Sequence, residues 1–260
     1  MDWRLITEER LDGPTAMAYD EVAAETVAEG GPATVRLYRW TPSTVSLGYA
    51  NDADIIDWEF CAANGIDVTR RATGGGAIYH DGVGEVAYSI IAPKADLPGD
   101  VTASYRQLLQ PVLSAFEAAG AEVRFAPEPS EPLWQPMCYL RGLDPAHDLV
   151  GPDGRKVAGN AQHRTREAVV QHGSLTVAAK PQRHIGCFAD PPVDPADFES
   201  TVTGIDVDRA ALVEKLEASL AAWADADDGG WTSVERERAA ELVDVKYDND
   251  SWVRDRGDPT

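Results

Sequence analysis

The sequence is organised around residues 70–81, which read Arg70-Arg71-Ala72-Thr73-Gly74-Gly75-Gly76-Ala77-Ile78-Tyr79-His80-Asp81. This stretch contains two arginines, three consecutive glycines and a Tyr-His-Asp run, and therefore offers little apolar side-chain surface for a hydrophobic core. Because glycine has no Cβ, its backbone N–H groups can approach a ligand closely and its φ can be positive. The guanidinium groups would favour a bound carboxylate or phosphate. A glycine-rich hairpin corner with solvated arginines is the alternative for this stretch alone.

Segments of regular structure surround this glycine corner. Apolar alternation and β-rich runs predict strands over residues 33–40, 44–47, 66–70, 85–92 and 122–125, and a β meander over 147–177. Helical spacing predicts helices over residues 14–29, 51–64, 102–119 and 208–224. A capping box, Thr232 with Glu235, predicts one further helix, and residues 225–230 are the best linker candidate.

Composition limits the possible functions. A chain of 260 residues with 43% apolar content can bury a full core, as one large domain or one domain with a small appendage. Its 44 acidic and 23 basic residues give a formal charge of −21, which argues against nonspecific binding to nucleic acid or anionic membranes. Because only five of the basic residues are lysines, we interpret the balance as an acidic, halophilic type of surface.

The cysteines and the N-terminus indicate the compartment. Cys61, Cys138 and Cys187 are an odd set without CxxC spacing, which argues against a disulfide framework or a structural zinc site and favours a reducing compartment. The polar N-terminus has no apolar signal region, and no run approaches the length of a membrane span. We therefore expect a cytoplasmic protein.

A second chemical stretch lies in the meander, from Gly154 to Gln162 (Gly-Arg-Lys-Val-Ala-Gly-Asn-Ala-Gln). Lys156 stands out because lysine is rare in this chain. Its ammonium group has three N–H donors and can bridge a carboxylate and a phosphate. A solvated turn lysine is the alternative. His172, in a strand-like segment before Gly173, is expected to be a packed, hydrogen-bonded residue.

Together these segments resemble the lipoate–protein ligase A family, within the biotin and lipoate A/B protein ligase superfamily that includes octanoyltransferases. The resemblance rests on the glycine corner with His80-Asp81, on Gly154 to Gln162, and on Gln171-His172-Gly173-Ser174. Weaker matches extend along most of the chain, from Met17-Ala18-Tyr19-Asp20-Glu21 to Lys246-Tyr247 and Trp252. One departure is Glu85, which stands where many of these ligases have a neutral amide.

The resemblance implies a fold and a site. The fold would be an α/β (α+β) domain with a mixed, largely antiparallel sheet flanked by helices, like the biotin ligase catalytic domain. Residues 1–206 would form the catalytic domain, and residues 207–260 a C-terminal helical segment packed on it, with no large accessory domain. Asp148 would help to hold Mg²⁺. The residues expected to bind ATP and the acyl substrate are Arg71, Gly74, Gly75, Gly76, Ala77, Ile78, Tyr79, His80, Lys156 and Gly159.

The activity implied first is that of an ATP-dependent lipoate–protein ligase. Such an enzyme joins lipoate or octanoate to AMP, with ATP and Mg²⁺ as co-substrates and no tightly bound prosthetic group. It then transfers the acyl group to a lysine of a lipoyl domain, in a 2-oxoacid dehydrogenase E2 subunit or the glycine-cleavage H protein. Lys156 would hold the attacking carboxylate beside the α-phosphate. Because the chain ends soon after Trp252, a separate small accessory subunit would complete the ligase.

The alternative activity within the same superfamily depends on Cys138. Octanoyltransferases carry a nucleophilic cysteine in a comparable loop and need no ATP. Cys138 would then form a thioester with an acyl group delivered by a carrier protein, with Lys156 assisting electrostatically. A merely buried Cys138, biotin as the substrate, and a non-catalytic binding module with this fold also remain open.

Overall fold

An eight-stranded sheet runs through the centre of the molecule, in the strand order β11-β1-β2-β6-β10-β9-β8-β7. The computed structural model describes residues 2–257. The strands of this sheet are β1 (Trp3–Leu11), β2 (Ala33–Trp40), β6 (Glu85–Pro93), β7 (Arg124–Phe125), β8 (Leu149–Val150), β9 (Lys156–Arg164), β10 (Ala168–Thr176) and β11 (Asp227–Asp228). β1 pairs in parallel with β2 and β11, and every other neighbouring pair in this sheet is antiparallel.

A three-stranded sheet beside it carries the glycine corner. Its order is β4-β3-β5, with β3 (Thr44–Leu47), β4 (Asp67–Arg70) and β5 (Ile78–His80). β3 pairs in parallel with β4 and antiparallel with β5. The corner is therefore the connection from β4 to β5, and both of its ends are held by β3.

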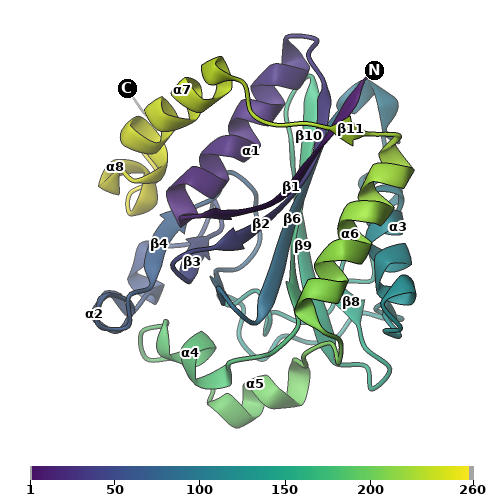
Figure 1. Cartoon of the computed structure of the whole chain (residues 1–260). Helices are drawn as coiled ribbons and strands as arrows, with labels where there is room; N and C mark the ends of the chain where they lie inside the picture. The colour runs from purple at the N-terminus through teal and green to yellow at the C-terminus, as the bar shows by residue number, and fades with distance from the viewer. Residues whose placement is uncertain (1, 258–260) are drawn as a thin grey trace.

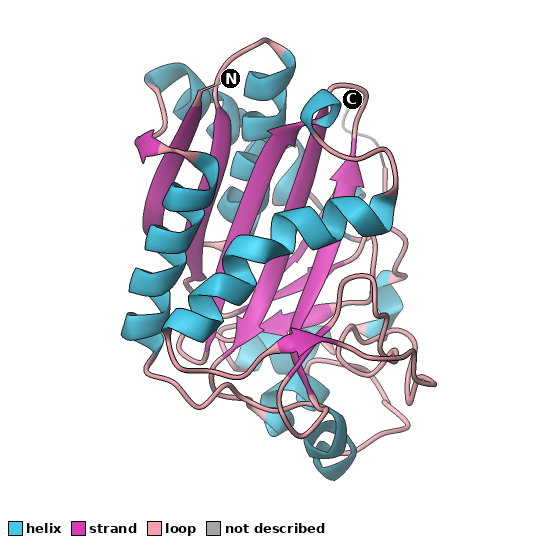
Figure 2. Ribbon diagram, turned by 90° about the vertical axis from the view of Figure 1, so that its right-hand side faces the viewer, coloured by secondary structure: helices cyan, strands magenta, loops and turns pink. Residues whose placement is uncertain are grey.

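Helices cover both faces of the large sheet (Figures 1 and 2). α1 and α7 lie on one face, and α3 packs against α6 on the other. β6 is buried at all nine positions because both of its faces are covered. The helices are α1 (Gly13–Ala28), α2 (Trp58–Ala63), α3 (Val101–Ala118), α4 (Pro181–Gly186), α5 (Pro195–Thr201), α6 (Arg209–Ala224), α7 (Ser233–Leu242) and α8 (Asp250–Val253), with short turns η1 (Ala53–Ile55), η2 (Lys94–Asp96) and η3 (Val243–Tyr247).

The predicted fold class is confirmed, because the main sheet is mixed, mostly antiparallel and flanked by helices. The capping box at the start of α7 is also present, with the Thr232 hydroxyl accepting from the Glu235 N–H. Within the described residues, no helix is both long and apolar enough to cross a membrane.

One strand was missed and two local predictions were wrong. β1 was not predicted, because its second half, Thr7 to Arg10, is polar and hides the strand pattern. Residues 51–64 form η1 and the short α2 instead of one helix. The linker candidate 225–230 contains β11, which adds to the edge of the large sheet beside β1. Sheet pairing at each end of the chain thus overrides the local sequence pattern.

Candidate active site

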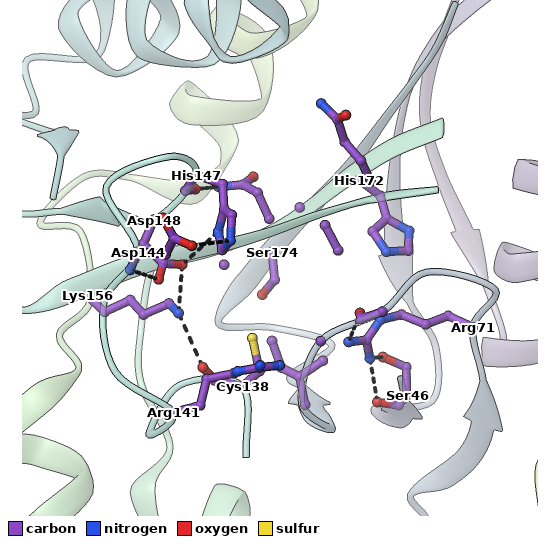
Figure 3. Close-up of a pocket in the computed structure, with 18 of the residues that line it drawn as sticks. Ser46, Arg71, Cys138, Arg141, Asp144, His147, Asp148, Lys156, His172 and Ser174 are labelled. Carbon is purple, nitrogen blue, oxygen red and sulfur yellow. Dashed lines mark hydrogen bonds and ion pairs between the residues drawn. The ribbon is translucent and has the colours of Figure 1, made fainter. Parts of the chain in front are cut away.

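A cavity of about 710 Å³ lies where the glycine corner, the 129–148 loop and strands β9 and β10 meet (Figure 3). Gly76, Ala77 and Tyr79 are not among the residues that line it. The other residues predicted from the sequence do line it: Arg71, Gly74, Gly75, Ile78, His80, Cys138, Asp148, Lys156 and Gly159. The fold thus joins the two chemical stretches of the sequence in one cavity, with Cys138 between them.

Arg71 holds the glycine corner in shape. Its guanidinium group donates to the Thr73 hydroxyl, to the carbonyl and hydroxyl oxygens of Ser46, and to the carbonyl oxygens of Gly74 and Gly76, at 2.8–3.0 Å. These five bonds engage all five guanidinium N–H donors. Burial lowers the Arg71 pKa to about 10, so the group stays charged at neutral pH. Arg71 therefore contributes charge to the cavity while its N–H groups shape the loop.

The glycine corner also positions the segment that carries Cys138. The Ala77 N–H donates to the Pro136 carbonyl (2.7 Å), and the Cys138 N–H donates to the Ala77 carbonyl (2.8 Å). A Cβ on Gly76 would lie 2.6 Å from the Cys138 backbone nitrogen, which is closer than real Cβ atoms come. Gly76 is thus required for the contact between two distant segments, although it does not line the cavity.

Cys138 is partly buried, and its sulfur lies over Gly159 in β9. A Cβ added to Gly159 would be 3.0 Å from the Cys138 Sγ and 3.8 Å from the Lys156 Cε. The Lys156 Nζ donates to the Cys138 carbonyl oxygen at 3.2 Å. The absence of a side chain at Gly159 therefore leaves room for the sulfur beside the lysine.

Lys156 and Asp148 form a buried ion pair, with 2.7 Å between Nζ and Oδ1. Burial by itself would lower the Lys156 pKa, but Asp148 and Cys138 outweigh burial and raise it above the ordinary value. Burial by itself would raise the Asp148 pKa, but Lys156 and His147 hold it below the ordinary value. Both groups are charged at neutral pH, so Lys156 is a fixed cation at the wall of the cavity.

His80 is held by three neighbours on its side of the cavity. Its Nε2 lies 2.9 Å from the Ser46 hydroxyl, and its Nδ1 lies 2.7 Å from Glu85 Oε1. Its ring stacks on Trp40, with 4.1 Å between centroids, and the Trp40 indole N–H donates to the same Glu85 oxygen. The departure noted at Glu85 therefore has a structural reason: its carboxylate fixes His80 and Trp40 together.

Several cavity residues were not predicted from the sequence. Ser46, Arg141, His147 and Asn160 line the cavity, and none of them was given a role, although Asn160 lies within the Gly154 to Gln162 stretch. His172 was expected to be packed and hydrogen-bonded. Its Nε2 lies 2.7 Å from the Thr73 hydroxyl and its Nδ1 lies 3.1 Å from Asp20 Oδ2, and burial lowers its pKa. His172 also lines the cavity, which only the pairing of β10 with its neighbours reveals.

The surroundings of Asp148 do not fit the expected Mg²⁺ site. Oδ1 is paired with Lys156, and Oδ2 accepts the Asp144 backbone N–H at 2.9 Å. Mg²⁺ prefers an octahedral set of oxygen ligands. Among residues 2–257, no group of three or more His, Cys, Asp or Glu side chains could hold a metal ion. We therefore assign no reaction step to a metal.

Comparison with known proteins covers nearly the whole chain. A family model described as the lipoyl protein ligase A/B catalytic domain matches residues 12–221. The octanoyltransferase LipM of Exiguobacterium sp. is 30% identical, with 96% of this chain and 97% of that protein aligned. The octanoyltransferase LipM of Kyrpidia tusciae is 32% identical over the same shares.

Solved structures share the fold. A crystal structure of lipoate-protein ligase A bound with ATP superposes with a TM-score of 0.80 at 23% identity, covering 98% of this chain and 99% of that one. A bi-partite lipoate protein ligase from Thermoplasma acidophilum superposes with a TM-score of 0.78 at 24% identity, covering 98% and 96%. At these identities the likeness is one of fold.

Proposed function

The chain belongs to the lipoyl protein ligase A/B catalytic-domain family, and from that premise we propose that it is an octanoyltransferase. It moves an octanoyl group from the thioester of a carrier protein to a lysine of a lipoyl-domain protein. The acyl group passes through a thioester on Cys138. The observation that carries this proposal is the position of the Cys138 sulfur, over Gly159 and beside the Lys156 cation in the cavity.

The expectation of an ATP-dependent lipoate–protein ligase was wrong. The relatives that align over almost the entire chain are named octanoyltransferases, at 30–32% identity. The likeness to an ATP-bound ligase is at 23% identity and extends to the fold only. ATP and Mg²⁺ as co-substrates, and the accessory subunit expected for a ligase, are therefore no longer required.

The first half-reaction is thioester exchange. The Cys138 sulfur attacks the carbonyl carbon of the octanoyl thioester, and the bond from that carbon to the carrier sulfur breaks. The carrier leaves as its free thiol, carrying the proton that Cys138 gives up. Negative charge develops on the carbonyl oxygen as the bond forms and on the carrier sulfur as it leaves, and the Lys156 ammonium, kept protonated by Asp148, stabilises this charge.

The second half-reaction forms the amide. The neutral ε-amine of the acceptor lysine attacks the Cys138 thioester carbonyl, and the carbon–sulfur bond breaks. One amine proton ends on Cys138, which returns to its thiol form, so no further reactant is consumed. Because the ion pair with Asp148 keeps Lys156 protonated, Lys156 acts in this step as a fixed positive charge and not as a proton acceptor.

The test supplies two sets of substrates to the purified chain, each with an apo lipoyl domain. One set is octanoyl carrier protein without nucleotide, and the other is free octanoate or lipoate with ATP and Mg²⁺. We expect acyl-lysine product from the first set only, together with an octanoyl mass increment on Cys138. ATP-dependent product that survives in Cys138→Ser would overturn the proposal.

Three variants complete this experiment. Cys138→Ser is expected to abolish transfer, whereas Cys61→Ser, which alters a buried thiol that does not line the cavity, is the matched control and keeps it. Lys156→Met leaves Asp148 buried without its partner, so it is compared with the double variant Lys156→Met/Asp148→Asn, in which the pair is neutral. We expect both to lose about 10²–10³-fold in rate if the cation itself is needed.

A further inference from the structure

Cys61 and Cys187 are neighbours in the core, although they are far apart in the sequence. Cys61 lies in α2, and Cys187 directly follows α4. Both side chains are buried, and both cysteines are free thiols. Hydrogen bonding to Cys187 lowers the pKa of the Cys61 thiol, and hydrogen bonding to Cys61 raises the pKa of the Cys187 thiol. The two sulfur atoms are therefore each other's polar partner.

Backbone contacts hold the two cysteine segments together independently of the thiols. The Asp57 N–H donates to the Cys187 carbonyl at 2.9 Å, and the Ala189 N–H donates to the Ile55 carbonyl at 2.9 Å. Ile56 and Phe188 form an antiparallel bridge between these bonds. Cys61 follows within one helical turn, since its own N–H donates to the Asp57 carbonyl. The chain thus fixes the two cysteines beside each other before any bond forms.

This pair takes no part in the proposed transfer. Neither residue lines the active-site cavity, which has its own cysteine, Cys138. Within residues 2–257, neither belongs to a cluster that could hold a metal ion. We propose that Cys61 and Cys187 are a modification site, at which a two-electron oxidant closes an intramolecular disulfide. Each thiol gives up one hydrogen, and an oxidant of the disulfide or azodicarbonyl class accepts both hydrogens and becomes reduced.

The disulfide would link α2 and α4, the two helices that lie next to the strands on either side of the glycine corner. α2 leads directly into β4 and so to Arg71. α4 carries Arg183, whose Nη1 donates to the Tyr79 hydroxyl on β5 at 3.2 Å. Because the cross-link closes a long loop that includes Cys138 and Lys156, it removes conformational freedom from the unfolded chain. Oxidation is therefore expected to stabilise the fold around the site without consuming Cys138.

The experiment uses the full chain and its Cys138→Ser variant. Each is treated with diamide well below the melting temperature, and in a second arm each is refolded in a glutathione redox buffer. The remaining thiols are then capped with N-ethylmaleimide under denaturing conditions and counted by intact mass. Cys61→Ser/Cys138→Ser and Cys187→Ser/Cys138→Ser are the matched controls, because each retains a single thiol.

We expect the Cys138→Ser variant to lose the mass of two hydrogens and to take up no maleimide, with a Cys61–Cys187 cross-linked peptide after digestion. Its melting temperature should rise by on the order of 5–10 °C and return on reduction. Both controls should keep their thiol. Two capped thiols in both arms, a cross-link that uses Cys138 in the unmodified chain, or a cross-linked protein that melts no higher than the reduced form would each overturn the inference.

Discussion

Gly159→Ala tests the placement of the Cys138 sulfur. The new methyl carbon would lie 3.0 Å from Sγ, whereas non-bonded heavy atoms prefer roughly 3.5–4.0 Å. The sulfur must therefore move by about 0.5–1 Å. Hydrogen bonding of the Cys138 N–H to Ala77 fixes the backbone, so the movement falls on the side chain. Lys156 Cε, at 3.8 Å from the methyl, is in ordinary contact and stays in place.

The size of the effect follows from that displacement. A misplacement of about 1 Å in a reacting group can cost on the order of 10²-fold in rate. We expect the rate of Cys138 acylation to fall by about 10–100-fold, which corresponds to roughly 1.4–2.7 kcal/mol in the activation barrier. Stability should change little, because the smaller freedom of alanine in the unfolded chain opposes the cost of displacing the sulfur in the folded one.

The assay is single-turnover acylation by octanoyl carrier protein, read by mass, with melting temperature measured in parallel. The matched control is Gly151→Ala, whose methyl would meet its nearest neighbours at an ordinary 3.5 Å and does not face the cavity. Acylation of Gly159→Ala at the wild-type rate would refute the reasoning, because the sulfur would then not lie over Gly159 when it reacts.

Two further predictions use other parts of the structure. Gly76→Ala should lower the rate of octanoyl transfer by about 10²-fold, because its new methyl displaces the Cys138 segment. Gly74→Ala, with nothing within 4 Å of its new methyl, should keep the rate within about threefold of wild type. Equal losses for the two variants in a transfer assay would contradict this reasoning. Burial lowers the His184 pKa to about 3, so the unfolded state binds a proton that the native state refuses. The contribution of neutral His184 to the free energy of unfolding is fully present above pH 6.5 and is lost progressively as the pH falls towards 3. At pH 5 the loss amounts to about 2 kcal/mol. In urea unfolding at several pH values, His184→Phe should reduce the fall in the free energy of unfolding between pH 6.5 and pH 3. A pH dependence equal to that of the wild type would contradict this prediction.

The local sequence was enough to identify those residues of the site whose role follows from the chemistry of their side chain or from its absence. Three consecutive glycines indicate that the backbone can approach a ligand closely, and a rare lysine indicates a positive charge, whatever the surrounding fold. Cys138 was identified as the decisive residue between two activities, but its surroundings were not. The pairing of Gly76 with the Cys138 segment joins residues that no local pattern connects, because the bonds run between two loops.

Asp148 shows why a residue type alone can mislead. A lone acidic residue before a glycine-lysine segment is compatible with a metal ligand or with an ion-pair partner. The choice depends on which way strand β9 directs Lys156 relative to Asp148, and the structure places Nζ 2.7 Å from the carboxylate. In the same way, three cysteines without motif spacing gave no sign that Cys61 and Cys187 are adjacent.

The sequence by itself thus determined the family and, through the resemblance to it, the class of fold and nine of the residues that line the cavity, because motifs built from glycines, charged residues and their spacing are properties of short segments. The tertiary structure decided which of those residues meet. Contacts between distant segments placed the glycine corner against the Cys138 segment, Lys156 against Asp148, and Cys61 against Cys187. Such contacts depend on strand order and on burial across the whole chain, and no short segment contains that information.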